Sequence, residues 1–504
     1  MSVRDRATRA PSLGLVTAGL WLLFAFNLGS LPLTDPDEGR YAEIAREMLA
    51  SGDWTEPRLF GIPYLEKPPL LYWLTALSLR ALGKSETAAR LVPSMAAAAG
   101  VLAVGAFASR TFGSNAGILA ATVLGTSVLY VALARAVVTD MLFSTGLSIA
   151  LLAFLRARVR DDARAFALAW LGLAIAVLAK GPAAIVLCLL VVSVDSALGR
   201  SWSWLVSRTF WLTLPVFLAI ALPWFVAIQI RRPEFFSFYL WKEHLNRVAG
   251  SEHPHPFYFY VPILLAGFLP WTPLAAAAAK SWCRAAREST PDAAVVRFLL
   301  VWSVVVFVVF SVSVGKLATY ILPVLCPLAI LLGRTLAERP TRTAYGIAGL
   351  AVVCYVATTF VEPLFAARFT PHPQIVELAA RLREGDELAM FGGYFPSVAF
   401  YLERPPLLVG VRQELRLGKS LEAGGLFVGD LAGLREAAPH GTLYLLTDVR
   451  AKRADELRSA LGSVELVSRN DEAALWMSPP AVSVSDGASS LGNREALRQD
   501  RQER

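Results

Sequence analysis

Residues 163–198 read ARAFALAWLGLAIAVLAKGPAAIVLCLLVVSVDSAL, two apolar runs separated only by Lys180-Gly181-Pro182. Each run approaches the roughly 20 residues that a helix needs to cross the hydrocarbon core of a bilayer. Inside lipid, only helices and closed barrels satisfy all of their backbone hydrogen bonds. The stretch therefore predicts two membrane-spanning helices joined by a tight turn.

Similar apolar runs fill the chain on both sides of this pair. Hydrophobic residues make up 55% of the sequence and charged residues 17%, whereas soluble domains carry about 25% charged residues. We predict an α-helical polytopic membrane protein with about eleven to thirteen transmembrane helices. The eleven ranges are 13–31, 88–108, 115–133, 140–157, 163–179, 182–198, 208–229, 257–278, 295–312, 317–333 and 343–362.

The basic residues are distributed as loop charges. Arginines cluster at alternate turns between the predicted spans, which is typical of cytoplasmic loops. The net charge of +8 is not gathered into a basic, aromatic-interleaved patch, so a nucleic-acid partner is not expected. The four cysteines are widely scattered and predict no disulfide framework.

With the N-terminus inside, every arginine cluster lies in the cytoplasm, and the first loop, residues 32–87, faces outward. The shorter loops 134–139, 180–182, 229–256 and 314–316 face the same side. Residues 69–82 would invert this order if they spanned the membrane. They are too short to do so, and their tyrosine and tryptophan suit the membrane interface.

An odd number of spans also places the rest of the chain outside. Residues 363–480 alternate strand-like runs (LAMF, TLYLL and ALWM) with helix-like stretches at 374–384 and 451–461, which predicts a small α/β domain. Residues 481–504 are rich in Ser, Gly, Arg and Gln and predict a disordered tail. The remaining domain, residues 1–362, is the predicted transmembrane domain.

The first outer loop carries several charged residues that could be functional. Asp35 and Glu38 are explained as an N-cap and a capping box at the start of a helix. Asp37 and Arg40, which we expect on the solvent-facing side of that helix, are not required for capping and are functional candidates. An acidic residue at this position can also simply complement the helix dipole.

Glu66 and Lys67 allow two interpretations. Lys67 either anchors the chain at the membrane interface by extending toward lipid headgroups, or it binds a phosphate while Glu66 binds a cation. Asp140 lies at the mouth of an apolar helix, where a carboxylate is costly unless it is paired or functional. Its structural alternatives are a helix cap or a partner for Arg135.

Three of the five histidines, His244, His253 and His255, lie in one outer loop near other acidic residues, and could contribute to a metal site. Lys316 and Tyr320 lie at the outer end of a later span. Together the outer loops supply carboxylates, lysines, an arginine and histidines. This combination suits a charged, phosphate-bearing ligand at the membrane surface.

Five motifs resemble one known family. They are DPDEGRYAEIAREMLASGDWTEPRLFGIPYLEKPPLLYW (35–73), ARAVVTDMLF (134–143), LAKGP (178–182), EHLNRV with the following HPHPFYFYVP (243–262) and GKLATYILP (315–323). The chain resembles the bacterial 4-amino-4-deoxy-L-arabinose transferases, the ArnT-like family, over about residues 10–335. These enzymes belong to the protein-mannosyltransferase-like group of polyprenyl-phosphate-sugar glycosyltransferases with the GT-C fold.

The resemblance implies an inverting glycosyltransferase in the bacterial inner membrane, with its active site facing the periplasm. It would move one sugar from a polyprenyl (undecaprenyl) phosphate carrier to an extracytoplasmic acceptor such as lipid A, another envelope glycan or a protein. Carried over by motif, the catalytic residues are Asp37 and Asp140. Glu66 and His244 would hold a divalent cation (Zn, Mg or Mn), and the carrier phosphate would be bound by a larger set: Arg40, Tyr41, Tyr64, Lys67, Arg247, Lys316 and Tyr320.

Two other functions fit a chain with many spans. A transporter or lipid flippase also contains intramembrane charges, but such proteins often show inverted repeats and charges near mid-span. Here the charges gather at the outer ends of the spans, which favours the enzyme. A membrane-anchored scaffold for envelope assembly would not need Asp37, Glu66 and Lys67 together.

Overall fold

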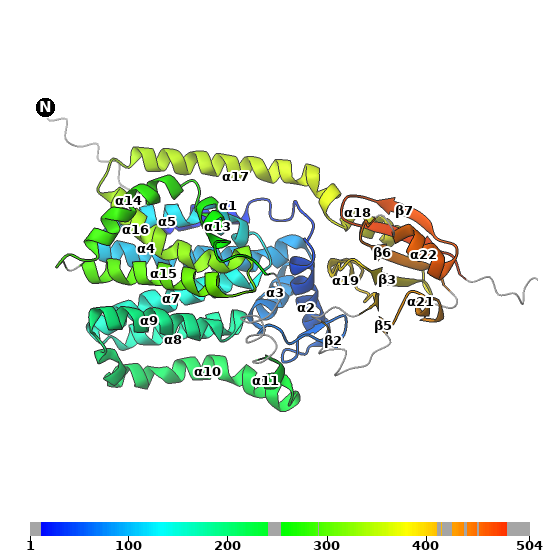
Figure 1. Ribbon diagram of the computed structural model, residues 1–504, viewed down its shortest axis with the longest axis horizontal. Helices are drawn as coiled ribbons and strands as arrows, with labels where there is room; N and C mark the ends of the chain where they lie inside the picture. The colour runs from blue at the N-terminus through cyan, green and yellow to red at the C-terminus, as the bar shows by residue number, and fades with distance from the viewer. Residues whose placement is uncertain are drawn as a thin grey trace, which may run out of the picture. The chain divides into compact units, whose positions relative to one another are not determined.

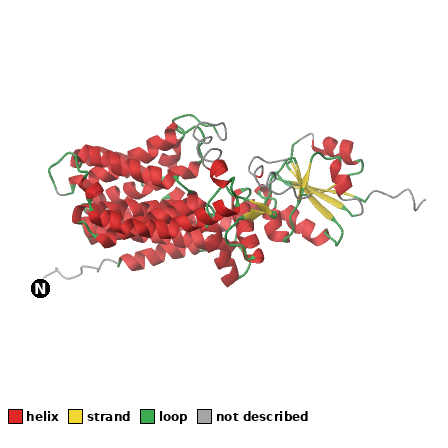
Figure 2. Ribbon diagram, turned by 90° about the horizontal axis from the view of Figure 1, so that it is seen from below, coloured by secondary structure: helices red, strands yellow, loops and turns green. Residues whose placement is uncertain are grey.

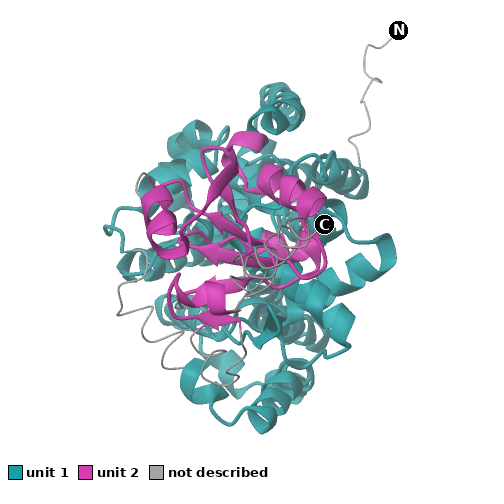
Figure 3. Ribbon diagram, turned by 90° about the vertical axis from the view of Figure 1, so that its right-hand side faces the viewer, with its two compact units in different colours: residues 1–366 teal, residues 367–504 magenta. Residues whose placement is uncertain are grey.

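The computed structural model describes residues 12–239, 254–290, 292–410, 415, 426–437, 441–450 and 453–480. The chain divides into two compact units, residues 1–366 and 367–504 (Figure 3). Long helices form most of the first unit, and nearly all of the strands lie in the second (Figure 2). The division follows residue 366, four residues after the predicted boundary at 362, and both positions lie within helix α17 (Arg342–Phe369).

The first unit is a bundle of apolar helices (Figure 1). Within the described residues, seven helices are long and apolar enough to cross a membrane, and two bent helix pairs pass the same test. With the shorter α1 (Leu13–Ala25) and α9 (Ala183–Gly199), they overlap all eleven predicted ranges. The seven are α4 (Glu86–Phe112), α7 (Thr139–Arg160), α8 (Ala163–Lys180), α10 (Arg208–Arg231), α15 (Ala293–Val312), η3 with α16 (Ala318–Ala337) and α17. The predicted polytopic α-helical fold is confirmed.

Two ranges that were predicted as continuous spans are broken. Helices α5 (Ser114–Gly125) and α6 (Val128–Ala134) meet at 69°, and α13 (Tyr260–Gly267) and α14 (Thr272–Ala285) meet at 108°. The two breaks contact each other. The indole of Trp271 donates to the Thr126 hydroxyl at 3.0 Å, and the Val128 N–H donates to the Leu269 carbonyl at 3.0 Å. Such bonds satisfy polar groups that a break would otherwise leave exposed to lipid.

Small residues allow two neighbouring helices, α7 and α8, to pack closely. A Cβ atom added to Gly146 would lie 2.8 Å from the Gly172 carbonyl oxygen, and one added to Gly172 would lie equally close to the Gly146 oxygen. Only glycine fits at this contact. Membrane helices associate mainly through such close packing, because lipid tails are as apolar as their side chains.

The arginine-rich ends of three helices meet at one end of the bundle. The fully buried Asp195 of α9 accepts a hydrogen bond from Arg297 of α15 at 3.0 Å and forms an ion pair with Arg158 of α7. These arginines come from helix ends that the charge pattern assigns to the same side. The bundle therefore agrees with the predicted alternation of loops.

The second unit contains a six-stranded sheet in the order β5-β4-β3-β6-β8-β7. The first four strands in this order are parallel, whereas β8 pairs with β6 and β7 in antiparallel fashion. The predicted strand-like runs form β3 (Glu387–Phe391), β6 (Leu443–Thr447) and β8 (Ala474–Ser478), and the predicted helix-like stretches form α18 (His372–Arg381) and α22 (Arg453–Leu461). The short β4 (Leu407–Val409) and β5 (Phe427–Val428) and the exposed β7 (Glu465–Arg469) were not predicted. The predicted tail, residues 481–504, lies outside the described residues.

Candidate active site

Helix α2 (Asp37–Ser51) begins the site, and its start differs from the predicted capping box. The residue before the helix is Pro36, and no side chain caps the helix there, so Asp35 is not the N-cap. Glu38 accepts hydrogen bonds from the backbone N–H and hydroxyl of Thr34, at 3.0 and 2.9 Å. The capping prediction was wrong for Asp35, whereas Glu38 does accept from a backbone N–H before the helix, that of Thr34. The same carboxylate also contacts a distant residue, Arg90.

The buried ion pair between Glu38 and Arg90 anchors α2 to the bundle. Arg90 of α4 donates to both carboxylate oxygens, at 2.8 and 2.6 Å, and the Val137 N–H donates to the same carboxylate at 3.0 Å. Burial alone would raise the pKa of Glu38, but the charge and hydrogen bonds of Arg90 oppose it and hold the pKa below its ordinary value. Glu38 therefore joins α2, α4 and the residues before α7.

Arg40 is buried, which corrects the prediction that it faces solvent. Its side chain is 7% exposed and forms an ion pair with Asp37, whose side chain is 51% exposed. The guanidinium lies 5.0 Å from the ring centroid of Tyr41 and 5.8 Å from that of Tyr64. The Arg40 guanidinium thus makes cation–π contacts with two buried tyrosine rings. The Asp37 carboxylate remains partly exposed to solvent.

The segment after the short hairpin of β1 (Arg58–Leu59) and β2 (Ile62–Pro63) supplies three more candidates. The Tyr64 hydroxyl donates to the Glu66 carboxylate at 2.9 Å, and the Lys67 ammonium lies 3.4 Å from the Glu66 carbonyl oxygen. Glu66 and Lys67 are 5% and 9% exposed. A lysine that reached lipid headgroups would be exposed, so the interface-anchor interpretation of Lys67 is wrong.

Asp140 pairs with a different residue from the one considered in the sequence. Its carboxylate accepts from the Lys180 ammonium at 2.5 Å, and both side chains are about nine-tenths buried. Arg135 instead donates to main-chain carbonyls, including that of Phe26 at 2.5 Å. The Lys180 ammonium also lies 4.0 Å from the ring centroid of Tyr320. The lysine that we interpreted as part of a tight turn is thus the partner of a candidate catalytic residue.

The Tyr41 phenol is influenced by charges of the first loop and by the Asp140 carboxylate. Burial raises the pKa of its phenol far above the ordinary value; the Arg40 charge lowers it, while the Asp37, Asp140 and Glu66 carboxylates raise it further. The phenol is therefore protonated at neutral pH and can donate a hydrogen bond. Carboxylates of both the first loop and the start of α7 thus act electrostatically on the Tyr41 phenol.

The other candidates are only partly described. Lys316 is buried, with 3% of its surface exposed. Its ammonium group donates hydrogen bonds to the carbonyl of His255, at 2.9 Å, and to that of Ser313. His244, His253 and Arg247 lie outside the described residues. Within the described residues, no group of three His, Cys, Asp or Glu side chains could hold a metal ion.

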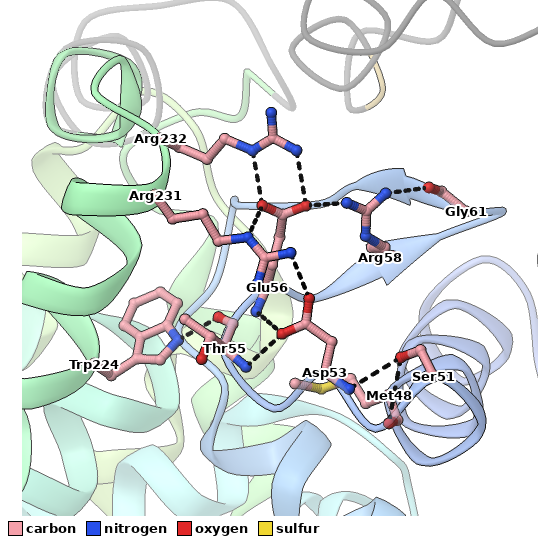
Figure 4. Close-up of polar contacts among 10 residues, drawn as sticks. All are labelled: Met48, Ser51, Asp53, Thr55, Glu56, Arg58, Gly61, Trp224, Arg231 and Arg232. Carbon is pink, nitrogen blue, oxygen red and sulfur yellow. Dashed lines mark hydrogen bonds and ion pairs between the residues drawn. The ribbon is translucent and has the colours of Figure 1, made fainter.

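A second ion cluster, centred on Glu56, joins the first loop to α10 (Figure 4). The carboxylate is fully buried and contacts Arg58 at 2.6 Å, Arg232 at 2.7 Å and Arg231 at 3.2 Å. We did not predict this cluster. One signal was present in the sequence, because a pair of arginines at an outer helix end is unusual under the positive-inside rule.

Known proteins share both the sequence motifs and the fold. The sequence profile of the dolichyl-phosphate-mannose-protein mannosyltransferase family matches residues 66–226. The undecaprenyl phosphate-alpha-4-amino-4-deoxy-L-arabinose arabinosyl transferase of Pseudomonas paraeruginosa is 34% identical over 364 residues, which are 68% of this chain and 65% of that protein. The corresponding protein of Edwardsiella ictaluri is 34% identical over 315 residues, 60% of this chain and 55% of its own length. The chain is thus similar to the ArnT-like family over about two thirds of its own length.

A solved structure supports the fold of this ArnT-like chain over nearly its full length. The crystal structure of ArnT from Cupriavidus metallidurans bound to undecaprenyl phosphate has a TM-score of 0.79 and 24% identity, covering 94% of this chain and 98% of that one. At this identity the likeness establishes the GT-C fold alone. The curated relatives are longer proteins, of which the chain spans between 55% and 65% in the two alignments above.

Proposed function

We propose that this chain is a glycosyltransferase that moves a sugar from a polyprenyl phosphate carrier to an acceptor outside the cytoplasm. One observation carries the proposal. Two carboxylates, those of Asp37 and Asp140, are each paired with a cation, and both act electrostatically on the Tyr41 phenol. Tyr64 and the adjoining Glu66-Lys67 pair belong to the same first loop as Asp37. The names of the curated relatives support an undecaprenyl-phosphate-linked donor.

The charges suit the transfer step. The acceptor oxygen attacks the anomeric carbon with inversion, the bond from that carbon to the phosphate oxygen breaks, and the carrier phosphate leaves with the bonding electron pair. Arg40 and Lys67 would stabilise the charge that develops on the phosphate. Asp37, which is 51% exposed and reachable by an acceptor, would take the proton of the acceptor hydroxyl.

A divalent cation, if present, would be held by Glu66 and His244. The buried Glu66 supplies one carboxylate ligand, and a cation such as Mg²⁺ is often bound through one or two carboxylates together with substrate phosphates. Bound at Glu66, a cation would add positive charge near the carrier phosphate. Metal analysis of purified protein would show one bound cation that is lost in Glu66→Gln. An unchanged metal content in this variant would exclude Glu66 as a ligand.

The sugar and the acceptor are proposed from the relatives. We infer 4-amino-4-deoxy-L-arabinose as the sugar and lipid A as the first acceptor to test, followed by other envelope glycans and proteins. We place the site on the periplasmic side of the inner membrane, because the arginine-rich loops favour the cytoplasm for the opposite end of the bundle.

The test is reconstitution of the full chain with defined substrates. Purified protein in lipid nanodiscs receives a short-chain polyprenyl-phosphate aminoarabinose and lipid A, and mass spectrometry follows the gain of one pentose residue on the acceptor. We expect transfer by the wild type and by Glu377→Gln, a control on the exposed surface of α18, and none by Asp37→Asn. Transfer to no acceptor from any polyprenyl-phosphate sugar would contradict the proposal.

A further inference from the structure

An apolar cavity lies within the helix bundle, and none of the catalytic candidates lines it. It has a volume of about 310 Å³ and lies among α7, α8, α9, α10 and the short helix η1 (Ser203–Val206). Helices α8, α9 and α10 are side by side in Figure 1. Ligand sites begin at about 300 Å³, so the space can accept part of a lipid chain. The side chains that line it are apolar, among them Phe154, Leu173, Val192, Phe210 and Leu214.

Parts of the cavity wall face the bilayer. Trp211, Leu189 and Leu218 are 54%, 56% and 42% exposed. These residues belong to membrane-spanning or apolar helices, so the medium outside them is hydrocarbon. A void has no atoms to contact on one side and forfeits dispersion energy. An acyl chain from the surrounding bilayer can fill it without leaving an apolar environment.

Two arginines precede the lining residues of this cavity, near the starts of α8 and α10. Arg208 is the first residue of α10 and precedes the lining residue Phe210 by two positions, or about 3 Å along the helix. Arg164 lies near the start of α8, five positions before the lining residue Ala169. Both arginines are exposed, and within the described residues neither forms an ion pair.

The fold brings these two arginines to the same place. The carboxylate of Asp161 accepts from the hydroxyls of Ser207 at 2.6 Å and Thr209 at 3.2 Å, the two residues that flank Arg208. Asp161 is itself three residues before Arg164. Two helices therefore begin beside each other here, and the N-terminus of a helix favours an anion.

The acidic residues nearby do not cancel this charge. Asp162 accepts from the backbone N–H of Arg164 at 3.0 Å and lies 3.7 Å from Arg156, while Asp161 is engaged by hydroxyls. Three arginines against two carboxylates leave a net positive charge at the membrane surface. Since the apolar cavity does not distinguish one lipid tail from another, any selectivity must come from this charged end.

We propose that the α7–α10 cavity is a binding site for an anionic phospholipid of the leaflet at the arginine-rich end of the bundle. One acyl chain fills the cavity, and the phosphate lies at Arg164 and Arg208. The site is independent of the proposed transferase activity, because none of its residues belongs to the catalytic candidates. It would fix the position of α10, whose other end carries Arg231 and Arg232 of the Glu56 cluster.

The test is native mass spectrometry of the delipidated full chain, titrated with phosphatidylglycerol or with phosphatidylcholine of the same acyl chains. We expect one retained phosphatidylglycerol and much weaker retention of phosphatidylcholine. Each arginine replaced, in Arg164→Gln and Arg208→Gln, should weaken phosphatidylglycerol binding by about fivefold. Arg287→Gln, an exposed arginine of another basic loop, is the matched control and should bind as the wild type does.

A second variant tests the cavity itself. Leu173→Trp would occupy the space and should reduce binding of both phospholipids; if this variant does not fold, the arginine variants decide alone. Equal binding of the two phospholipids by the wild type would overturn the proposal. One-for-one displacement of phosphatidylglycerol by undecaprenyl phosphate would overturn it as well, because the cavity would then belong to the carrier.

Discussion

Asp37 and Asp140 carry the same functional group, a carboxylate, in two different environments. Asp37 is half exposed and paired with Arg40, whereas Asp140 is nine-tenths buried and held by Lys180. An acceptor hydroxyl can reach the first carboxylate more easily than the second. We therefore assign the proton-accepting role to Asp37 and a positioning role to Asp140 within the proposed reaction.

Replacing Asp37 by Asn should abolish transfer without unfolding the protein. The amide cannot accept the proton, and general-base catalysis contributes about 10²–10⁴-fold in rate. We expect kcat to fall by at least about 100-fold, with the melting temperature close to that of the wild type. Turnover near the wild-type value would leave Asp37 only as the partner of Arg40.

Replacing Lys67 by Ala should raise the KM for the donor and lower kcat. A buried ammonium that meets the carrier phosphate interacts more strongly as charge builds on that phosphate. We expect kcat/KM to fall at least about tenfold, or about 1.4 kcal/mol, and Lys67→Arg to retain part of the activity. Steady-state kinetics with a short-chain donor measures this, and an unchanged donor KM would remove Lys67 from the site.

Replacing Lys180 by Met should destabilise the protein, because Asp140 would keep a buried charge without its partner. Breaking a buried ion pair from one side typically costs about 3–5 kcal/mol. The double variant Lys180→Met with Asp140→Asn removes both charges and should recover much of the melting temperature but not the activity. A double variant as unstable as the single one would show that Lys180 acts through its packing against Tyr320.

At the scale of elements, α2 is held by contacts from other helices rather than by its own cap. The Glu38–Arg90 ion pair attaches its first turn to α4, and the Glu56 cluster attaches the loop that follows it to α10. Both carboxylates are buried and each meets at least one guanidinium. The first loop is thus fixed to the helices of the bundle at two points.

The Glu38–Arg90 pair should make stability depend on pH in one direction. The pKa of Glu38 is lowered in the folded protein, so its contribution is complete above the unfolded value of 4.5 and is lost as the pH falls through the folded pKa. Glu38→Gln should lower the melting temperature at pH 7. The difference between wild type and variant should shrink below about pH 4.5; a constant difference would contradict the ionised pair.

At the scale of the whole molecule, the positions of the charged residues distinguish the two ends of the helix bundle. Asp195, Arg158 and Arg297 gather at one end, and the candidate active site is formed by loops that the charge pattern places at the other. This arrangement assigns every loop of the first unit to one of two sides.

Labelling in intact cells would test this assignment with a natural control. Cys283 is exposed and lies between Lys280 and Arg284 near the end of α14, so it should react with an impermeant thiol reagent only after permeabilisation. A cysteine introduced at Ala50, which is exposed on α2, should react from outside. The background for both measurements is Cys354→Ser. Labelling of both positions from the same side would refute the topology.

The sequence by itself determined the membrane-spanning helices and their order. Hydrophobic length is a local property, since about 20 apolar residues span a bilayer whatever they pack against. The distribution of arginines predicts the side that each loop faces, for a similarly local reason. The first-loop motif indicated the likeness to the ArnT-like family, and the runs LAMF, TLYLL and ALWM located the longer buried strands of the second unit. The short β4 and β5 gave too few residues for such a pattern.

Only the tertiary structure decided which charges form pairs. Asp140 and Lys180 are 40 residues apart, Glu38 and Arg90 are 52 apart, and Glu56 and Arg232 are 176 apart. A buried carboxylate must have a partner, but the sequence offers many arginines and lysines, and the nearest one along the chain was the wrong choice for Asp140. The burial of Arg40 and Lys67 could not be predicted from the sequence either. A long charged side chain near the membrane interface can point toward water or into the protein. The packing of α2 and α3 (Leu70–Leu82) against the bundle decides between these positions, and that packing depends on contacts between helices distant in the chain.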